Sequence, residues 1–432
     1  MHTTISQSGP LRGEITVAPD KSISHRAVIF SALAQGVGTV GNFLLAEDTL
    51  SSCSCVRQLG IDIRQEGSQL QIYGRGLHGL REASSVLDCG NSGTTMRLLS
   101  GLLAAQPFFS VLSGDQSLNH RPMKRVIEPL QIMGADIWGR QNNQSPPLAI
   151  KGTGLKGLRY HMPIASAQVK TALLLAGLDA DSETVLFEPE KSRDHSENML
   201  KAMGADIKAN GLEIDLQPGQ ELTPQDFLVP GDISSAAFFI VAANLVPGSE
   251  LLIKDIGINH TRDGIIEVIR QMGGKIDLQN QRMIGGEEVA DLVVGSAALR
   301  GVTIRGEIIP RLIDEIPVLA VAMAFAEGES VVEGAGELRV KETDRIAAIC
   351  SELGNLGWVI EEREDGFKIQ GDPDMARKKL GTFKVNSHGD HRIAMSLAIA
   401  ALCMRGETLI HGTEAVSISF PEFWSRLEEI RS

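Results

Sequence analysis

The sequence has few of the features that mark secreted, membrane-spanning or metal-binding proteins. No apolar run approaches the roughly 18 residues that a membrane-spanning helix needs. Its start, MHTTISQSGPLRGE, has neither a basic end nor an apolar middle, so we expect no signal peptide and a cytoplasmic location. The five cysteines form no CxxC or Cys/His zinc pattern, and Cys53 and Cys55 lie too close together for a structural disulfide. We therefore expect reduced cysteines that fill the core.

Positive charge is scarce as well. With 41 Lys and Arg against 54 Asp and Glu, the net charge is −13, which argues against binding to nucleic acid or to a membrane, because both need a basic face. There is no P-loop, and GTGLKG at 152–157 has a dinucleotide spacing but does not open a helix. His388 and His391 lack a third spaced ligand, so no metal site is predicted. Any anionic ligand has to be met by a local cluster of cations.

What the sequence does contain is a module that occurs six times. A polar cluster precedes an apolar helix rich in Ala and Leu; a strand, a second helix and, in five cases, a strand pair follow, so that the module is βαβαββ. Because 432 residues are many for one core, we expect an α/β protein of two globular domains, with three modules in each. The modules recur about every 70 residues, and their first helices begin near Lys21, Gly90, Ser166, Gly231, Asp314 and Gly389.

Basic residues recur at the predicted helix starts, where the helix dipole disfavours each by a few tenths to about 1 kcal/mol. Free backbone N–H groups at helix starts bind anions, and added Lys and Arg strengthen such a site, so the pattern indicates a polyanionic small-molecule substrate. Alternatively, these cations lie on solvated helix ends or pair with acids such as Glu47 and Glu197. Arg262 has the same placement without a surrounding motif, and we interpret it as structural. The cations in question are Lys21, Arg26, Arg121, Lys124, Arg193, Lys341, Arg345 and Arg392.

Two N-terminal segments are suited to holding a phosphate. In PDKSISHR, Lys21 stands just outside the predicted helix, Ser22 is the expected N-cap, and Arg26 lies one turn later on the same face. In GNSGTTMR, Gly93 lets the backbone approach a ligand closely.

Two C-terminal segments carry acids beside cations. RVKETDR places Lys341, Glu342 and Arg345 within about one turn of a predicted helix, either as a surface salt-bridge ladder or with Glu342 as a proton donor or acceptor whose pKa its neighbours set. Asp314 opens an apolar helix, either as its N-cap or as a general base.

Taken together, these motifs resemble the 3-phosphoshikimate 1-carboxyvinyltransferase (EPSP synthase) family over essentially the whole chain. The resemblance implies a two-domain inside-out α/β barrel of six βαβαββ repeats, with residues 21–230 in one domain, 1–20 plus 231–432 in the other, and the active site in the interdomain cleft. The segments that carry it are PDKSISHR, GNSGTTMR, NHRPM, SAQVKTALL, RDH, IDEIPVLAVA, RVKETDR and GDHRIAM.

The resemblance also implies the reaction. The enolpyruvyl group of phosphoenolpyruvate passes to the 5-hydroxyl of shikimate 3-phosphate by addition and elimination, on the route to chorismate and aromatic amino acids. Neither a metal nor an organic cofactor is implied, and we expect a monomer whose partners are its small-molecule substrates. Asp314 would be the base, and Glu342 and Lys21 the proton carriers, with the donor to the methylene carbon left open between them.

The same motifs imply the binding residues. Shikimate 3-phosphate would contact Lys21, Ser22, Arg26, Ser166, Ala167, Gln168, Arg193, Asp314 and Lys341. Phosphoenolpyruvate would contact Lys21, Gly93, Arg121, Gln168, Arg345 and Arg392.

One departure from the family pattern is Ile418, where some members carry a Lys that contacts phosphoenolpyruvate. Gly93 leaves the room that a bulkier residue would remove, so we expect at least partial inhibition by glyphosate. One rival is UDP-N-acetylglucosamine enolpyruvyltransferase, but it uses a Cys ahead of an Arg-Pro segment, and GDQSLNHRPM has none. Another is a noncatalytic anion-binding protein of the same fold, which would need the cations but not Asp314 and Glu342.

Overall fold

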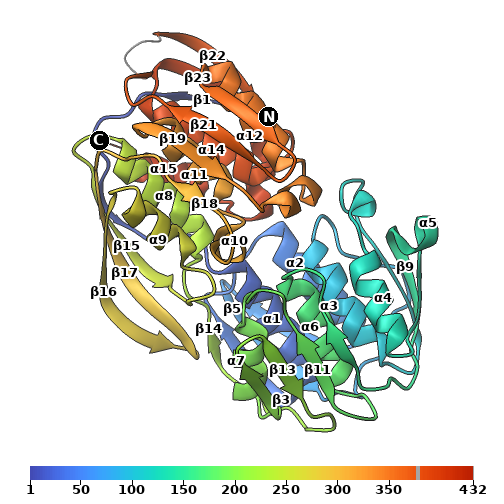
Figure 1. Ribbon diagram of the computed structural model, residues 1–432. Helices are drawn as coiled ribbons and strands as arrows, with labels where there is room; N and C mark the ends of the chain where they lie inside the picture. The colour runs from blue at the N-terminus through green and yellow to red at the C-terminus, as the bar shows by residue number, and fades with distance from the viewer. Residues whose placement is uncertain (376–379, 432) are drawn as a thin grey trace. The chain divides into compact units, whose positions relative to one another are not determined.

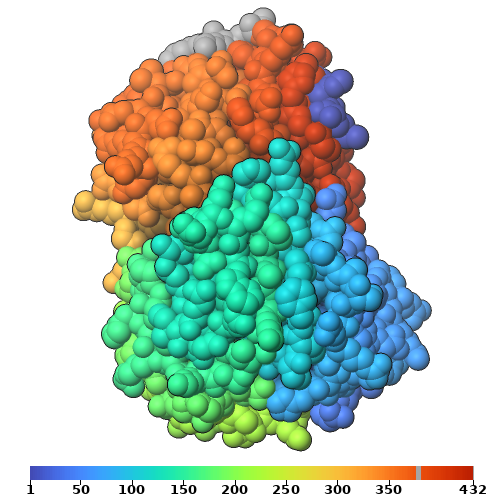
Figure 2. All heavy atoms as spheres, turned by 90° about the vertical axis from the view of Figure 1, so that its right-hand side faces the viewer, coloured from blue at the N-terminus to red at the C-terminus, as the bar shows by residue number. Residues whose placement is uncertain are grey.

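The structure is a computed structural model that describes residues 1–375 and 380–431 (Figure 1). The chain divides into two compact units. The N-terminal unit comprises Pro19–Val229 and Ile284–Gly286, and the C-terminal unit comprises Met1–Ala18, Pro230–Met283 and Glu287–Ser432. Among the described residues, no helix has the length and apolar character needed to cross a membrane. Figure 2 shows that segments coloured blue through green make up a continuous face of the N-terminal unit.

The N-terminal unit contains three four-stranded sheets of one topology, and each sheet belongs to one repeat. Counted across each sheet from one edge, the first two strands are parallel. The third strand pairs antiparallel with the second and the fourth. The first repeat comprises α1 (Lys21–Leu33), β3 (Gln35–Gly41), α2 (Glu47–Gln58), β4 (Asp62–Glu66), β5 (Gln69–Arg75) and the short β14 (Phe227–Leu228).

The second and third repeats follow the same order along the chain. The second comprises β6 (Leu87–Asp88), α3 (Gly93–Ala104), β7 (Phe109–Ser113), η1 (Leu118–His120), α4 (Lys124–Ile132), β8 (Asp136–Gly139), α5 (Arg140–Asn143) and β9 (Ser145–Lys151). The third comprises β10 (Arg159–His161), α6 (Ala167–Gly177), β11 (Thr184–Phe187), α7 (His195–Ala202), β12 (Ile207–Asn210) and β13 (Glu213–Leu216).

The C-terminal unit repeats this plan with two four-stranded sheets and one three-stranded sheet. The fourth repeat comprises β2 (Arg12–Ile15), α8 (Ile233–Leu245), β15 (Glu250–Gly257), α9 (Gly264–Gln271), β16 (Lys275–Ile284) and β17 (Glu287–Gly295). The fifth comprises β18 (Thr303–Ile304), α10 (Ile308–Leu312), α11 (Ile316–Ala324), β19 (Gly328–Val332), η2 (Gly336–Val340), α12 (Arg345–Leu356), β20 (Val359–Arg363) and β21 (Gly366–Gly371). The sixth comprises β22 (Leu380–Asn386), α14 (His391–Cys403), β23 (Arg405–His411), η3 (Thr413–Ile418) and α15 (Phe423–Glu429).

Three strands come from distant parts of the chain. The first repeat takes β14 as its first strand, and the fourth repeat takes β2, which pairs parallel with β15. In the described part of the sixth repeat no strand pair follows α15. Instead, β1 (His2–Ser6) pairs antiparallel with β23, so that His2 lies opposite His411. The predicted sixfold βαβαββ organisation is therefore confirmed, with the last sheet completed by the start of the chain.

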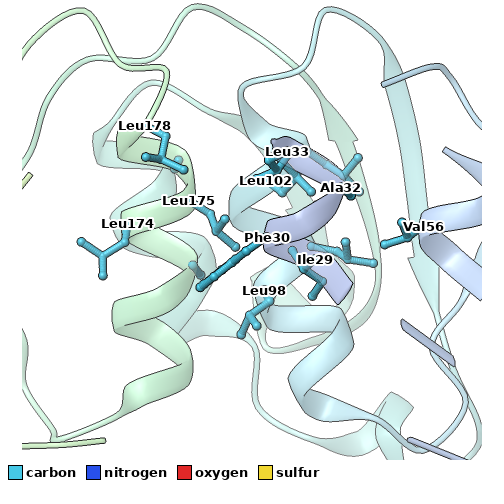
Figure 3. Close-up of a cluster of buried hydrophobic side chains, with 14 of the residues drawn as sticks. Ile29, Phe30, Ala32, Leu33, Val56, Leu98, Leu102, Leu174, Leu175 and Leu178 are labelled. Carbon is cyan, nitrogen blue, oxygen red and sulfur yellow. The ribbon is translucent and has the colours of Figure 1, made fainter. Parts of the chain in front are cut away.

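The first helix of each repeat lies inside its unit. In α14 all the residues from His391 to Cys403 are buried, and in α1 all those from Ile23 to Leu33. A helix that is apolar on all sides is typical of a buried core element, and the sheets then lie outside the helices. Figure 3 shows this core in the N-terminal unit, where Phe30 of α1 lies close to Leu98 of α3 and Leu175 of α6.

Two of these helices pack at backbone contact. A Cβ atom added to Gly101 of α3 would lie only 1.9 Å from the carbonyl oxygen of Ala172 in α6. Only glycine fits at such an approach. The close packing of α3 and α6 brings their N-terminal turns together, and both turns carry predicted site residues.

All five cysteines are unpaired and buried, as the sequence predicts. Burial raises the pKa of the thiols of Cys53, Cys350 and Cys403 to about 12. Such thiols are chemically unreactive near neutral pH, which fits a role in packing.

Candidate active site

The start of α1 differs in detail from the prediction. Asp20, and not Ser22, is its N-cap, because the Asp20 carboxylate accepts the Ile23 N–H at 2.8 Å. The carboxylate at this position starts the helix at Lys21, two residues earlier than expected, and a negative charge there also suits the helix dipole. Ser22 is thereby left to accept a hydrogen bond from Arg193 Nη1 at 3.2 Å.

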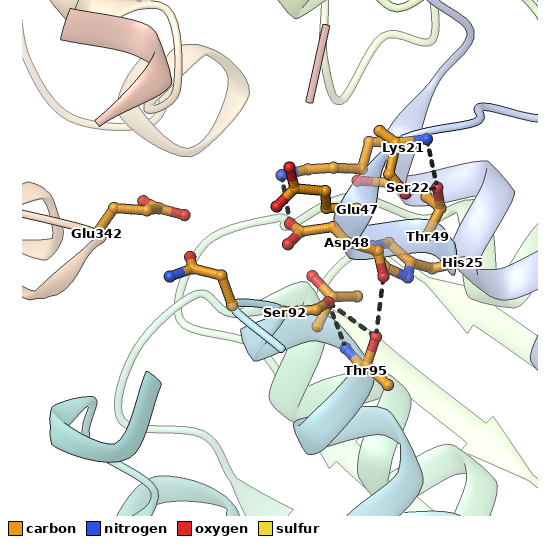
Figure 4. Close-up of polar contacts among 12 residues, drawn as sticks. Lys21, Ser22, His25, Glu47, Asp48, Thr49, Ser92, Thr95 and Glu342 are labelled. Atoms are coloured by element: carbon orange, nitrogen blue, oxygen red, sulfur yellow. Dashed lines mark hydrogen bonds and ion pairs between the residues drawn. The ribbon is translucent and has the colours of Figure 1, made fainter. Parts of the chain in front are cut away.

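Lys21 is held by a carboxylate that belongs to none of the motifs described above. Its Nζ lies 3.0 Å from Oδ2 of Asp48, a buried residue in the first turn of α2 (Figure 4). Beside this pair, a chain of short polar contacts joins the starts of three helices. His25 Nδ1 lies 2.8 Å from Ser52 Oγ, Ser52 Oγ lies 2.7 Å from Thr95 Oγ1, and Thr95 Oγ1 donates to Ser92 Oγ at 2.8 Å. Burial lowers the pKa of His25 well below its usual value, so this ring is neutral.

Arg26 is buried, with 2% of its surface exposed, so the alternative of a solvated helix end is wrong for it. Its Nε donates to Ser196 Oγ of α7 at 2.7 Å and its Nη2 to Thr171 Oγ1 of α6 at 2.9 Å. Its Nη1 donates to the carbonyl of Ser22 at 3.0 Å. The guanidinium thus links helices of the first and third repeats.

Two further guanidinium groups gather over the start of α3. The Gln168 carbonyl oxygen accepts from Arg97 Nη1, and the Gln168 amide donates to Thr94 Oγ1 at 2.8 Å. Arg121 donates to the side chain of Asn91. A Cβ atom on Gly93 would lie 2.9 Å from Arg97 Nη1 and 3.4 Å from Arg121 Nη1. Glycine therefore lets both cations lie against the helix start.

The start of α6 supplies backbone donors. Ser166 is its N-cap and accepts the Val169 N–H at 3.4 Å, and the helix begins at Ala167. The first N–H groups of a helix have no partner within it and are suited to an anion. The N-terminal unit thus brings together Lys21, Ser22, Arg26, Gly93, Arg121, Ser166, Ala167, Gln168 and Arg193 on the starts of its buried helices or in the segments that lead to its outer helices.

In the C-terminal unit, Arg345 is the centre of a second cluster. Only 1% of its side chain is exposed, and it contacts three carboxylates: Asp390 at 2.7 Å, Asp314 at 3.2 Å and Glu342 at 2.6 Å. Burial acts against the charged guanidinium, but the Coulomb attraction of Asp390, Glu342 and Asp314 outweighs it and raises the pKa of Arg345. This residue is a permanent cation.

Asp314 lies against two more cations. Lys341 Nζ is 3.7 Å from its Oδ1, and Arg392 Nη2 is 3.9 Å from its Oδ2, while Arg392 Nη1 donates to the Asp314 carbonyl at 3.1 Å. Desolvation lowers the pKa of Lys341, although Asp314 acts in the opposite direction. The N-cap of α11 is Glu315, so the alternative in which Asp314 caps that helix is wrong.

The prediction that Lys341, Glu342 and Arg345 share one helical turn is also wrong. Lys341 has extended backbone at the end of η2, and α12 begins only at Arg345. The reason is that the Asp344 side chain accepts the Ala347 N–H at 3.0 Å and caps the helix there. Glu342 contacts Arg345 from the segment between η2 and α12.

Comparison with known proteins agrees with this geometry. The family model described as EPSP synthase (3-phosphoshikimate 1-carboxyvinyltransferase) matches residues 5–427. A protein named 3-phosphoshikimate 1-carboxyvinyltransferase from Syntrophomonas wolfei is 64% identical over 98% of this chain and 98% of its own. Another of that name, from Syntrophotalea carbinolica, is 52% identical over 99% of this chain and 98% of its own. The chain belongs to the EPSP synthase family.

Solved structures give the same result for the fold. An EPSP synthase from Acinetobacter baumannii superimposes with a TM-score of 0.88 at 44% identity, covering 100% of this chain and 98% of that one. The enolpyruvyl transferase NikO from Streptomyces tendae superimposes with a TM-score of 0.78 at 18% identity, over 99% and 96% of the two chains, and so shares the fold. The inside-out α/β barrel of six repeats, expected from the resemblance to EPSP synthases, is confirmed.

Some cations of this EPSP synthase family member lie outside the two clusters. Lys124 is half exposed and pairs with Glu128 at 3.3 Å, so the solvated helix end is the right description for it. Arg262 is buried and bonds Asp232 at 2.9 Å and Ser234 at 2.7 Å at the start of α8. Ile418, where some EPSP synthases carry a Lys, ends η3 and is partly buried. Within 1–375 and 380–431, no group of three or more His, Cys, Asp or Glu is arranged to hold a metal ion.

Four residues of the clusters were not anticipated: Asp48, Asn91, Arg97 and Asp390. Asp48 and Asp390 each stand at a helix start in the sequence, where an acid is expected as a cap or a dipole partner. Because this role already explains each acid, the sequence does not indicate that they pair with Lys21 and Arg345. Arg97 lies in the GNSGTTMR segment, and its position one turn into α3 was the available signal.

Proposed function

We propose that the chain transfers the enolpyruvyl group of phosphoenolpyruvate to the 5-hydroxyl of shikimate 3-phosphate and releases phosphate. It is an enolpyruvyl transferase of the EPSP synthase family, and both of these small substrates carry a phosphate and a carboxylate. The observation that supports the assignment best is the presence of two cation clusters, one of which, around Arg345, also holds acids suited to proton transfer. We infer that the N-terminal unit corresponds to the domain of residues 21–230 and the C-terminal unit to residues 1–20 with 231–432.

The proposed binding roles follow the chemistry of the two clusters. Arg26 and Arg193 offer forked donors to the phosphate of shikimate 3-phosphate, and the N–H groups at the start of α6 offer further donors. This acceptor is held by Lys21, Ser22, Arg26, Ser166, Ala167, Gln168, Arg193, Asp314 and Lys341. Phosphoenolpyruvate is held by Lys21, Arg121, Gln168, Arg345 and Arg392, with Gly93 leaving the space for it.

The proposed chemistry proceeds in two steps. In the addition step, Asp314 accepts the 5-hydroxyl proton, the oxygen bonds to C2 of phosphoenolpyruvate, and Glu342 or Lys21 protonates the C3 methylene. In the elimination step, the new methyl group loses a proton, the double bond re-forms, and phosphate leaves. Arg345 contacts both Asp314 and Glu342, so it orients the two acids relative to each other.

A sugar-nucleotide acceptor is the main alternative, since it would use the same donor on the same fold. The segment that carries the Cys of that enzyme class contains Asn119, His120 and Arg121 here, and the structure gives them local roles: Asn119 donates to the Gly114 carbonyl, and Arg121 to Asn91. None of these three residues carries a thiol.

The decisive experiment measures phosphate release from phosphoenolpyruvate with shikimate 3-phosphate, with UDP-N-acetylglucosamine and with no acceptor. Release that depends on shikimate 3-phosphate supports the proposal. In that case Asp314→Asn and Glu342→Gln should lower kcat by about 100-fold or more, the usual scale for a lost acid or base. Lys124→Met serves as the control for loss of a cation, because Lys124 lies outside both clusters. Release only with the sugar nucleotide, or with neither acceptor, would refute the assignment.

A further inference from the structure

A buried group of three charged side chains lies behind the proposed acceptor site. Lys170 of α6 is completely buried, and its Nζ lies 3.0 Å from Glu188 Oε2 and 2.6 Å from Glu197 Oε1. Both carboxylates are buried too, with 2% and 7% of their side chains exposed. A buried ion pair is weak support for stability, because desolvation offsets the attraction between the charges. We call these three residues the Lys170 triad.

One arm of the triad fixes the segment that leads to Arg193. Glu188 follows β11, and its second carboxylate oxygen accepts from the backbone N–H of Ser192 at 3.2 Å and from the Ser192 hydroxyl. Lys170 Nζ also reaches the Ser192 carbonyl at 3.5 Å. The residue after Ser192 is Arg193, whose guanidinium donates to Ser22. The triad therefore fixes the backbone position from which the Arg193 side chain extends.

The other arm supports Arg26. Glu197 follows Ser196 in α7, and Lys170 precedes Thr171 in α6. Ser196 and Thr171 are the two hydroxyl groups that receive Arg26 Nε and Nη2, and they lie 2.6 Å from each other. Because Lys170 joins Glu197 of α7 to its own helix, it holds these hydroxyl groups in register.

We propose that Lys170 is a positioning residue for shikimate 3-phosphate, which it serves by fixing Arg26 and Arg193 without touching the substrate. The proposal rests on the function proposed above. The triad carries one ammonium and two carboxylates, so it is already one negative charge in excess. Without the ammonium, two buried carboxylates would attract the nearby guanidinium groups and draw them away from the phosphate. The contacts around Gly93 and Arg121 do not involve the triad.

The test is Lys170→Met in the full-length enzyme. We expect KM for shikimate 3-phosphate to rise about tenfold or more, because misplacement of Arg26 and Arg193 by a fraction of an ångström is enough to weaken binding by that factor. In contrast, kcat and KM for phosphoenolpyruvate should change by less than about threefold. Titration calorimetry of shikimate 3-phosphate should show the same loss of affinity without turnover.

A pH series separates positioning from simple destabilisation. Burial already raises the pKa of Glu197, even with Lys170 beside it. In Lys170→Met, Glu197 should take up a proton more readily, so the ratio of variant to wild-type KM should fall between pH 8 and pH 6. Taking the ratio removes the titration of the substrate phosphate itself. A purely structural role predicts a ratio that does not depend on pH.

Two further variants keep the result decisive. Leu216→Ala removes a fully buried side chain of β13 in the same repeat and should lower Tm while leaving KM for shikimate 3-phosphate unchanged. Glu197→Gln removes one carboxylate but keeps the Lys170–Glu188 pair, so it should give a smaller rise in KM for shikimate 3-phosphate. It replaces Lys170→Met in the test if Lys170→Met does not fold. An unchanged KM in an active enzyme, or a change that Leu216→Ala reproduces, would overturn the proposal. A wild-type enzyme without shikimate 3-phosphate-dependent phosphate release would count against the proposed function instead.

Discussion

Arg345 and Asp390 form a completely buried ion pair that joins the starts of two helices. The Arg345 Nε atom donates to Asp390 Oδ2 at 2.7 Å, with 1% and 0% of the side chains exposed. Asp390 also caps α14 by accepting from the backbone N–H groups of Arg392 and Ile393. One carboxylate therefore orients two arginines of the C-terminal cluster, Arg345 through its side chain and Arg392 through its backbone.

Arg345→Lys should lower kcat/KM for phosphoenolpyruvate by about 100-fold, equivalent to about 2.7 kcal/mol of transition-state stabilisation. A lysine keeps the charge but loses the planar fork that contacts three carboxylates at once. Steady-state kinetics with phosphoenolpyruvate varied would measure the loss. Arg262→Lys is the matched control, because Arg262 is an equally buried arginine paired with Asp232 in the same unit. It should lower Tm and leave KM for phosphoenolpyruvate unchanged, and equal kinetic effects in the two variants would contradict the assignment.

Gly93→Ala should raise KM for phosphoenolpyruvate by about tenfold and change KM for shikimate 3-phosphate by less than about twofold. The added Cβ would lie 2.9 Å from Arg97 Nη1 and 3.4 Å from Arg121 Nη1, so one or both guanidinium groups must shift. If glyphosate occupies the same space, the wild type should be inhibited and the variant inhibited less. Gly154→Ala, where no heavy atom lies within 4 Å of the added Cβ, is the control. An inhibition constant of the wild type far above its KM for phosphoenolpyruvate would contradict the glyphosate hypothesis.

Phe30→Ala should lower the free energy of unfolding of the N-terminal unit by about 3–5 kcal/mol, the range for a large aromatic side chain removed from a core. Phe30 is fully buried between α1, α3 and α6 (Figure 3). Denaturant titration followed by circular dichroism would measure the change. Phe109→Ala, at a phenylalanine that is 48% exposed, should cost less than about 1 kcal/mol. A loss below 1 kcal/mol in Phe30→Ala would mean that this core is not packed as described.

Asp291→Asn should destabilise the protein near neutral pH by about 1–2 kcal/mol. This loss should become smaller as the pH falls below about 4 and should vanish only below about pH 2. Burial acts to raise the pKa of Asp291, but the N–H of Asp255, the amide of Asn280 and the ammonium of Lys254 outweigh it, and the pKa falls to about 2. A carboxyl group whose pKa is lower in the folded than in the unfolded protein stabilises the fold above its unfolded pKa. This stabilisation is lost as the pH falls through the folded value.

Chemical denaturation at pH 7, pH 5 and pH 3 would test this dependence. Asp277→Asn is the control, because Asp277 is an exposed carboxylate on the neighbouring strand β16. A destabilisation by Asp291→Asn that is the same at all three pH values would show that the charge is not its cause.

The native protein should be inert to thiol reagents at pH 8. All five cysteines are buried, and the pKa of about 12 for Cys53, Cys350 and Cys403 leaves almost no thiolate at that pH. A colorimetric disulfide reagent should therefore react with essentially none of them in the folded protein and with all five after unfolding in guanidinium chloride. Rapid reaction of one thiol in the native state would indicate local opening at that residue.

The repeat architecture could be predicted because the same pattern of helices and strands occurs six times in the sequence. Each buried helix is a mainly apolar run that follows a polar start, and six copies of one pattern leave little room for error at any single one. The N-terminal start of α1 was less predictable. Asp20 and Ser22 are both good N-cap residues, and the sequence does not say which of the two the chain uses.

The ion pairs of the two clusters could not be predicted for a different reason. Lys21 and Asp48 are brought together by the packing of α1 on α2, and Arg345 and Asp390 by the packing of α12 on α14. A local pattern gives the helix start on which each residue lies but not its partner on another element. RVKETDR shows the same limit, since the cap at Asp344 removed Lys341 and Glu342 from the helix while Arg345 still reached Glu342.

The pairing of β1 with β23 bears on how the chain folds as it is synthesised. All the strands of the first three sheets have been made once Leu228 has left the ribosome. The strands β1 and β2 must wait much longer, because their partners β23 and β15 lie far along the chain. Unpaired strands are prone to associate with other chains, so this interval is when a nascent chain is most exposed to misassembly. The strands β1 and β2 are therefore among the last to find their partners, although they are made before those of the first three sheets.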